Sequence, residues 1–142
     1  MNNFISNDIK LKFIGIINFN KKLNNLIKKS EKLTKNNKTL QINLALNYGS
    51  KNEILNAVKK IVKKKIVITE KNFTKCLYTK NIPDPEILIR TGKQIRLSNF
   101  LLWQVAYSEI FFEKKLWPDF NEQDFINIIN KYKKIVRNFG NI

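Results

Sequence analysis

Histidine is absent from this chain of 142 residues, and cysteine occurs once, at Cys76. Without histidine there is no imidazole for acid–base catalysis or for metal binding. One cysteine forms neither an intramolecular disulfide nor a cysteine-built metal site. This cysteine usage fits a reducing compartment, so we expect a cytoplasmic protein. No apolar run reaches the length of a membrane span, and the first ten residues lack the charged start and apolar middle of a signal peptide.

Arginine is also scarce, because Arg90, Arg96 and Arg137 stand beside 24 lysines. The guanidinium group is a planar fork that grips a phosphate or carboxylate through two parallel hydrogen bonds, which an ammonium group does not do. In a chain that otherwise uses lysine, Arg90 and Arg96 therefore indicate positions where lysine does not serve. The alternative is that both are surface residues by chance.

Acidic residues are few as well, 11 against 27 basic ones, which gives a net charge of +16. Such a charge is typical of proteins with anionic partners. However, Lys, Asn and Ile are abundant together, with 24, 21 and 21 residues, as in proteins from A/T-rich genomes. Neither an aromatic stacking motif nor an arginine-bearing recognition helix stands out. We therefore expect no nucleic-acid partner.

Strand and helix patterns alternate along the chain, and 43% of its residues are hydrophobic, enough for a core. This order is typical of parallel βαβ units, so we predict an α/β fold with a partial parallel sheet, flanking helices and a single domain over residues 1–142. The predicted elements are a strand at Ile9–Gly15, a helix at 20–33, a strand at 39–47, a helix with a capping box of Ser50 and Glu53, a short helix capped by Thr69, a strand at 86–89, a helix starting at Ser98 and a helix at 121–139.

One predicted strand ends in a group of residues suited to bind an anion. Ligands of parallel sheets bind outside the carboxyl ends of strands, and the strand at 86–89 is followed by Arg90 and a Thr-Gly pair. Arg96 and then Ser98 follow, and a helix start at Ser98 would add free amide groups. These groups together would form a diphosphate site. The alternative, that Ser98 is merely a helix cap and both arginines are solvated, weighs about equally.

Glu109 lies within the most apolar stretch of the chain, at 100–112. A carboxylate in such surroundings is costly unless it is paired, binds a metal or reaches water. Mg²⁺ takes oxygen ligands and bridges carboxylates to substrate phosphates, so Glu109 is a candidate metal ligand. The alternatives are that Glu109 points to solvent at the end of a helix or forms an ion pair.

The chain resembles the cis-prenyltransferase family, and most closely the bacterial undecaprenyl diphosphate synthase type. The resemblance rests on the segments at 90–109 (RTGKQIRLSNFLLWQVAYSE), 116–120 (LWPDF), 47–49 (NYG) and 83–90 (PDPEILIR). It implies the C-terminal part of the cis-prenyltransferase fold. The family condenses isopentenyl diphosphate with an allylic diphosphate such as farnesyl diphosphate, and the bacterial product is the lipid carrier for cell-wall synthesis. By resemblance, Arg90, Arg96 and Ser98 would hold the diphosphate of isopentenyl diphosphate, and Glu109 would help bind Mg²⁺.

The sequence also departs from the family pattern. The family motifs Asp-Gly-Asn-Gly-Arg-Trp-Ala, whose Asp handles Mg²⁺, and Phe-Ser-Ser-Glu-Asn-Trp are both missing. Lys93 replaces a usual Gly, Ile95 stands where many members have His or Gln, and the tail reads Asn138-Phe139-Gly140 where many have Arg-x-Gly. We therefore expect an N-terminally truncated domain that has no catalytic Asp and is inactive or severely impaired alone.

The resemblance leaves the partners of this chain open. It would form a homodimer or complement an N-terminal fragment, and it would touch membranes peripherally through a lipid product. The alternatives are a non-catalytic partner subunit of a full-length synthase and a degenerate fragment that only records ancestry.

Overall fold

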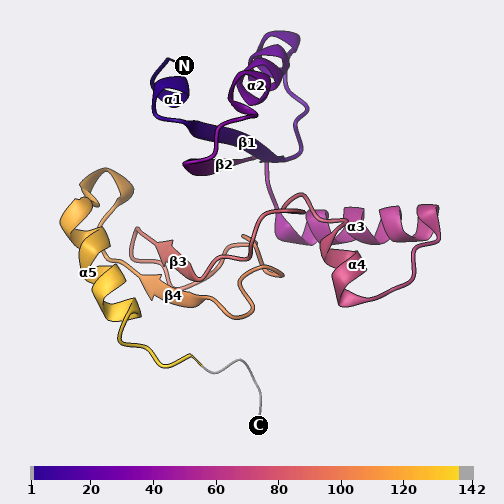
Figure 1. Cartoon of the computed structure of the whole chain (residues 1–142). Coiled ribbons are helices and arrows are strands. Elements are labelled where there is room, and N and C mark those ends of the chain that lie inside the picture. The colour runs from indigo at the N-terminus through magenta and orange to yellow at the C-terminus, as the bar shows by residue number, and fades with distance from the viewer. Residues whose placement is uncertain (1, 138–142) are drawn as a thin grey trace. The chain divides into compact units, whose positions relative to one another are not determined.

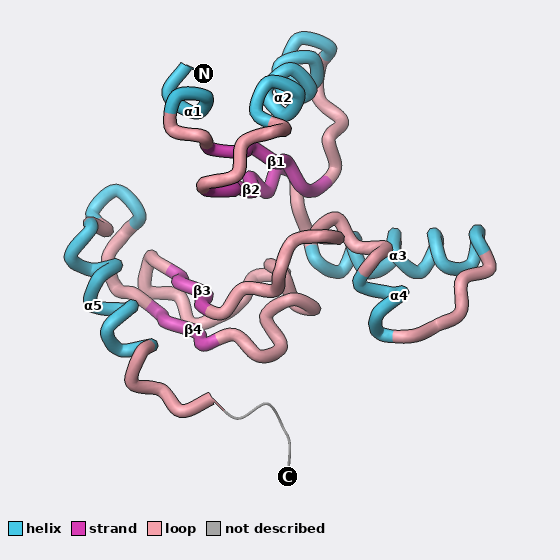
Figure 2. Tube along the Cα trace, viewed as in Figure 1, coloured by secondary structure: helices cyan, strands magenta, loops and turns pink. Residues whose placement is uncertain are grey.

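The computed structural model describes residues 2–137, and the chain divides into two compact units, Met1–Asn81 and Ile82–Ile142. Figures 1 and 2 show the elements of both units. Each unit contains a pair of parallel strands with helices, so the predicted α/β class is confirmed. The expectation of a single domain over 1–142 stays a prediction.

The first unit begins with a βαβ motif, as its sequence pattern predicts. β1 and β2 pair in parallel, with a register that runs from Ile9 opposite Leu40 to Gly15 opposite Leu46. The elements of this part are α1 (Asn2–Ser6), β1 (Ile9–Gly15), α2 (Lys21–Thr34) and β2 (Leu40–Leu46). Gly15 has φ 113°, and a Cβ atom there would lie 2.1 Å from the carbonyl oxygen of Leu46. A glycine is therefore required where the two strands end.

Side chains of α2 close the outer edge of β1. The Thr34 hydroxyl accepts a hydrogen bond from the N–H of Leu11 at 3.0 Å. The Glu31 carboxylate accepts one from the N–H of Phe13 at 3.1 Å. A strand edge with unpaired N–H groups invites pairing with another chain, so these bonds protect β1.

The helix α3 (Ser50–Lys64) forms as predicted, but its cap differs. Gly49 is the N-cap and Ser50 is the first helical residue, so the predicted capping box of Ser50 and Glu53 is wrong. The N–H of Glu53 bonds to the Gly49 carbonyl, and the Glu53 carboxylate accepts from the Tyr48 hydroxyl and from the N–H of Tyr78. The Glu53 carboxylate is therefore used to bond Tyr48 and Tyr78 rather than to cap α3.

The remainder of the first unit is the short helix α4 (Glu70–Thr74) and the turns that follow it. Thr69 caps α4 as predicted, because its hydroxyl accepts a hydrogen bond from the N–H of Asn72.

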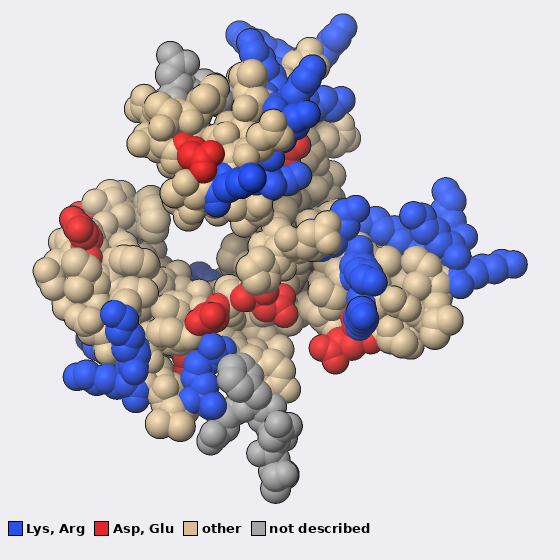
Figure 3. Space-filling model, in the orientation of Figure 1, with Lys and Arg blue, Asp and Glu red and all other residues tan. Residues whose placement is uncertain are grey.

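In the view of Figure 3, basic side chains project from both α2 and α3. The lysines of this unit therefore spread over two helices rather than lining one groove in that view.

The second unit is built on two short parallel strands. β3 pairs with β4 in a register that runs from Ile87 opposite Glu109 to Arg90 opposite Phe112. Its elements are β3 (Ile87–Arg90), β4 (Glu109–Phe112), the 3₁₀ helix η1 (Trp117–Asp119) and α5 (Glu122–Tyr132). Asn121 and Asp124 form a capping box at the start of α5. The predicted closing helix thus begins where expected but ends at Tyr132, and its last residues, 138 and 139, lie outside the described residues.

The helix predicted to start at Ser98 does not form. Ser98, Asn99 and Leu101 have φ angles of 49°, 63° and 47°. Residues in this left-handed region do not propagate a right-handed helix. The chain runs through turns from residue 98 to residue 107. Glu109 consequently opens the strand β4 instead of ending a helix.

Candidate functional site

Arg90 stands at the carboxyl end of β3, where the sequence placed a ligand site. The carbonyl of Arg90 accepts from the N–H of Glu113 at 2.7 Å, just beyond the end of β4. The N–H groups of Gly92 and Lys93 donate to the carbonyls of Lys115 and Glu113. These bonds attach the base of the Arg90 loop, residues 90–98, to the segment that follows β4.

The Arg90 loop folds back so that its end meets its beginning. Nη1 of Arg90 donates to the Ser98 hydroxyl oxygen at 2.8 Å and to the carbonyl oxygen of Arg96. The Arg90 side chain, the Ser98 side chain and the Arg96 backbone are thereby brought together. The Arg96 side chain is exposed, and residues 2–137 give it no hydrogen bond or ion pair. The three predicted diphosphate-binding residues thus share one loop.

The Nε atom of the Arg90 guanidinium remains without an acceptor in the described part of the chain. Nε of Arg90 is buried and has no hydrogen-bond partner among residues 2–137. A buried donor of this kind costs free energy, and most such groups in proteins are satisfied. Nε and Nη2 form one edge of the planar fork, the arrangement that binds phosphate through two parallel bonds. An anionic oxygen at this edge would satisfy the orphaned donor.

Two of the departures from the family pattern, Lys93 and Ile95, lie on the same loop, whereas the tail departure at 138–140 lies outside the described residues. Lys93 has φ 63°, in the left-handed region that glycine adopts without cost, so the backbone keeps the shape that the family's usual Gly would favour. The Ile95 side chain is 80% exposed. It offers no polar side-chain atom to a ligand of the loop.

Glu109 lies at the opposite end of the strand pair from Arg90. The register pairs Glu109 with Ile87, so its Cα lies three residues back along β4 from the residue opposite Arg90. This spacing corresponds to about 10 Å along a strand. The helix start at Ser98 that was expected to add free amide groups to the diphosphate site does not form. The half-buried Glu109 carboxylate has no hydrogen bond or ion pair with residues 2–137.

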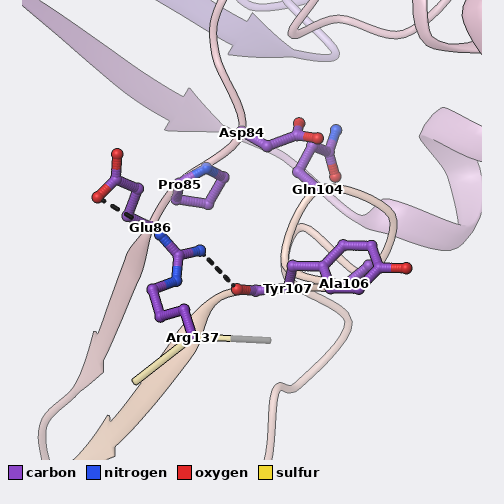
Figure 4. A pocket seen from close by; sticks show the side chains of 7 residues that line it. All are labelled: Asp84, Pro85, Glu86, Gln104, Ala106, Tyr107 and Arg137. Carbon is purple, nitrogen blue, oxygen red and sulfur yellow. Dashed lines mark hydrogen bonds and ion pairs between the residues drawn. The ribbon is translucent and has the colours of Figure 1, made fainter. Parts of the chain in front are cut away.

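A polar cluster that the sequence reasoning missed lies beside Glu109, and Figure 4 shows most of it. Arg137 donates from Nη2 to the Tyr107 carbonyl at 3.0 Å and from Nη1 to the Tyr132 hydroxyl at 2.9 Å. The Tyr132 hydroxyl donates to the Glu86 carboxylate, which lies 3.6 Å from Arg137. We name these residues, Glu86, Tyr107, Tyr132 and Arg137, the Arg137 cluster. The rarity of arginine was the signal that could have found it.

The Arg137 cluster borders a pocket of about 310 Å³. The residues that line the pocket are Asp84, Pro85, Glu86, Gln104, Ala106, Tyr107 and Arg137. Donation to the Glu86 carboxylate raises the pKa of Tyr132, because ionisation would abolish that bond and place two negative charges together. The phenol therefore stays protonated and continues to donate to Glu86 at neutral pH.

Over residues 2–137 the structure contains no group of three or more His, Cys, Asp or Glu side chains able to hold a metal ion. Glu109 offers one carboxylate. Mg²⁺ often uses one or two protein carboxylates and completes its octahedron with water and phosphate oxygens. Glu109 therefore fits one ligand position of such a site but does not form a complete one. Among the same described residues, no helix has the length and apolar character needed to cross a bilayer.

These features define an α/β protein with an arginine loop at the carboxyl end of a parallel strand. The family model of undecaprenyl diphosphate synthases matches residues 1–140, and the chain belongs to this family. It is 47% identical over 150 residues to the ditrans,polycis-undecaprenyl-diphosphate synthase of Wigglesworthia glossinidia brevipalpis, a match that covers 100% of this chain and 58% of that protein. It is 49% identical over 117 residues to an isoprenyl transferase of Thermotoga maritima, covering 79% of this chain and 50% of that one.

Solved structures show the same relationship. A probable undecaprenyl diphosphate synthase from Campylobacter jejuni superimposes with a TM-score of 0.89 at 35% identity, covering 99% of this chain and 67% of that one. Lavandulyl diphosphate synthase from Lavandula x intermedia, in complex with dimethylallyl diphosphate, superimposes with a TM-score of 0.87 at 33% identity. This match covers 98% of this chain and 67% of that one. The predicted family and the C-terminal part of its fold are confirmed. The chain spans about half to three-fifths of the length of the curated relatives named above.

Proposed function

We propose that this chain supplies the isopentenyl-diphosphate half of a cis-prenyltransferase. The complete reaction would condense isopentenyl diphosphate with an allylic diphosphate such as farnesyl diphosphate. Its product would be a cis-polyprenyl diphosphate of the undecaprenyl type, the lipid carrier for cell-wall synthesis. The observation that carries the proposal is the Arg90 loop, in which the Arg90 guanidinium contacts Ser98 and its Nε has no acceptor among residues 2–137.

The chemistry of the loop suits a diphosphate. Because Arg90 donates to the Ser98 oxygen, the Ser98 hydroxyl proton is left to donate to a phosphate oxygen. The edge of Arg90 that contains Nε would grip a second phosphate oxygen through two bonds, and the exposed Arg96 side chain would add a further fork. Donors already positioned around a diphosphate stabilise its negative charge without further rearrangement.

We further propose that Glu109 provides one ligand to Mg²⁺. A bound Mg²⁺ would neutralise charge on the diphosphates. The Glu109 carboxylate suits this role because it is half-buried, begins a strand and has no partner among residues 2–137. The remaining ligands would come from phosphates, water and a part of the enzyme outside this sequence.

We propose that the chain either forms a homodimer or complements an N-terminal fragment that carries the Asp-Gly-Asn-Gly motif. Such a fragment would supply the Asp-Gly-Asn-Gly motif, which is not among the 142 residues of this sequence. We expect no turnover from these 142 residues alone, because the family Asp that handles Mg²⁺ is not among them. The assembled enzyme would work in the cytoplasm and contact membranes peripherally through its lipid product.

The decisive experiment mixes this chain with an N-terminal fragment of a related synthase and measures incorporation of radiolabelled isopentenyl diphosphate. We expect polyprenyl product from the mixture and none from either part alone. The matched control uses the Arg90→Lys variant, which keeps the charge but loses the fork, and should give much less product. Absence of product in every pairing would overturn the split-enzyme proposal.

A further inference from the structure

The Arg137 cluster ties together the two chain segments that enter the strand pair of the second unit. Tyr107 lies two residues before the start of β4, and its carbonyl accepts from Nη2 of Arg137. Glu86 directly precedes β3, and its carboxylate accepts from Tyr132 and lies 3.6 Å from Nη1 of Arg137. Arg137 thus bridges the amino ends of both strands (Figure 4).

Glu109 begins β4 at the place that these contacts hold. Its N–H donates to the Glu86 carbonyl at 2.9 Å, and the hydroxyl of the preceding Ser108 donates to the Pro85 carbonyl. The backbone around Glu109 is therefore fixed by bonds from the segment before β3 and, through Tyr107, from Arg137. The Glu109 carboxylate itself takes no part in these bonds. Its backbone is therefore held in place while the carboxylate oxygens remain available to a ligand.

The bonding geometry at Arg137 requires an arginine. Two donors on different nitrogens reach the Tyr107 carbonyl and the Tyr132 hydroxyl, and the guanidinium carbon lies 5.7 Å from the Tyr132 ring centre. A lysine ammonium is a point charge on a flexible stem and does not reproduce a planar fork. The side chain of Arg137 is 21% exposed, whereas that of Glu86 is 67% exposed. The arginine is thus the more enclosed member of the pair.

From this arrangement we propose that Arg137, with Tyr132 and Glu86, is a positioning residue that holds Glu109 in place for a divalent cation. The inference rests on the proposed function of Glu109. Groups that orient a metal ligand typically change metal affinity by about 10-fold or more when they are removed. The Arg90 loop lies at the other end of the strands, so binding of the diphosphate without metal should be independent of Arg137.

The test compares binding of isopentenyl diphosphate alone, by calorimetry, with binding of Mn²⁺ in its presence, by electron paramagnetic resonance. Mn²⁺ serves as the paramagnetic probe for Mg²⁺. The full chain is used as wild type and as Glu109→Gln, Arg137→Ala, Arg137→Lys and Lys134→Ala. Lys134 is the matched control because it is exposed and belongs to the same segment after α5.

We expect Glu109→Gln to abolish Mn²⁺ binding and Arg137→Ala to weaken it about 10-fold. Arg137→Lys should not rescue it, and Lys134→Ala should match the wild type. Metal-free binding of isopentenyl diphosphate should stay unchanged in the two Arg137 variants and in Lys134→Ala. Arg137→Ala with wild-type Mn²⁺ affinity would overturn the inference, as would an equal loss of both affinities, which would indicate general damage to the unit.

Failure of the proposed function would look different. If the wild-type protein binds no Mn²⁺, or if Glu109→Gln binds it normally, Glu109 is not a metal ligand. The inference about Arg137 is then overturned as well. Wild-type protein that does not bind isopentenyl diphosphate at all would overturn the role of the Arg90 loop. In that case Mn²⁺ with inorganic diphosphate still tests the effect of Arg137 on Glu109.

Discussion

Two acidic residues, Glu53 in the first unit and Glu109 in the second, have opposite surroundings. In the first unit, Glu53 is 1% exposed and accepts bonds from Tyr48 and Tyr78, and Glu31 closes the edge of β1. In the second unit, the half-buried Glu109 has no such partner within residues 2–137. A buried charge that is fully bonded serves the fold, whereas one left without a partner is available to a ligand. The comparison separates structural acids from candidate functional ones.

The largest expected effect is on the free energy of unfolding when Glu53 is replaced. Glu53→Ala would leave the Tyr78 N–H and the Tyr48 hydroxyl without their acceptor, and each such group costs about 1–3 kcal/mol. We expect the free energy of unfolding of the first unit to fall by about 3 kcal/mol, measured by hydrogen exchange of α3 amides. Glu109→Ala should change the stability of the second unit by less than about 0.5 kcal/mol. Equal losses for the two variants would contradict the contrast between the units.

The second prediction concerns Arg90. Arg90→Lys should weaken binding of isopentenyl diphosphate by about 10-fold, because charge-assisted bidentate bonds are replaced by a single point charge. Calorimetry on the full chain measures this change. Lys114→Ala is the control, since Lys114 is an exposed lysine of the same unit. If both variants bind equally well, the diphosphate does not sit in the Arg90 loop.

A smaller effect is expected for the strained backbone of the Arg90 loop. Lys93 adopts φ 63°, a conformation that costs about 1 kcal/mol for a residue with a Cβ atom. Lys93→Gly should therefore raise the free energy of unfolding of the second unit by about 1 kcal/mol in urea titrations followed by tryptophan fluorescence. Asn99, with φ 63° in the same unit, provides the comparison. Asparagine tolerates this region, so Asn99→Gly should gain less; a larger gain there would refute the explanation.

The smallest effect concerns two partly buried aspartates, one in each unit. Hydrogen bonds from the Thr39 hydroxyl and from two backbone N–H groups lower the pKa of Asp8, whereas a hydrogen bond from Lys115 lowers the pKa of Asp124. A lowered pKa means that each stabilises the fold above its unfolded pKa of 3.8, and that this contribution is lost as pH falls through the folded pKa.

Salt should distinguish the two aspartates, because it screens an exposed ion pair more than bonds from neutral donors. In NMR titrations, raising the salt concentration should move the pKa of Asp124 toward 3.8 more than the pKa of Asp8. A larger salt response for Asp8 would show that its lysine neighbour, rather than the neutral donors, sets its pKa.

Most elements could be predicted from the sequence, because their signals are local. The alternation at Ile9–Gly15, the Thr69 cap and the start of α5 at Asn121 each depend on nearby residues. The prediction of a helix from Ser98 was wrong. The apolar run has the composition of a buried helix, but the backbone takes left-handed turns there. An apolar run by itself does not distinguish a buried helix from buried turns and a short strand.

The candidate site divides along the same line. The scarcity of arginine and the motif around it were sufficient to select the candidate residues, because the residue type determines which chemical group a side chain carries. These residues are Arg90, Arg96, Ser98 and Glu109. Tertiary structure alone decided that Glu109 lies at the far end of the strands from Arg90. It also alone joined Arg137 to Tyr107, 30 positions earlier in the chain. Sequence gives the identity of groups and their local geometry, whereas contacts between distant segments depend on strand register and on packing that no single segment contains.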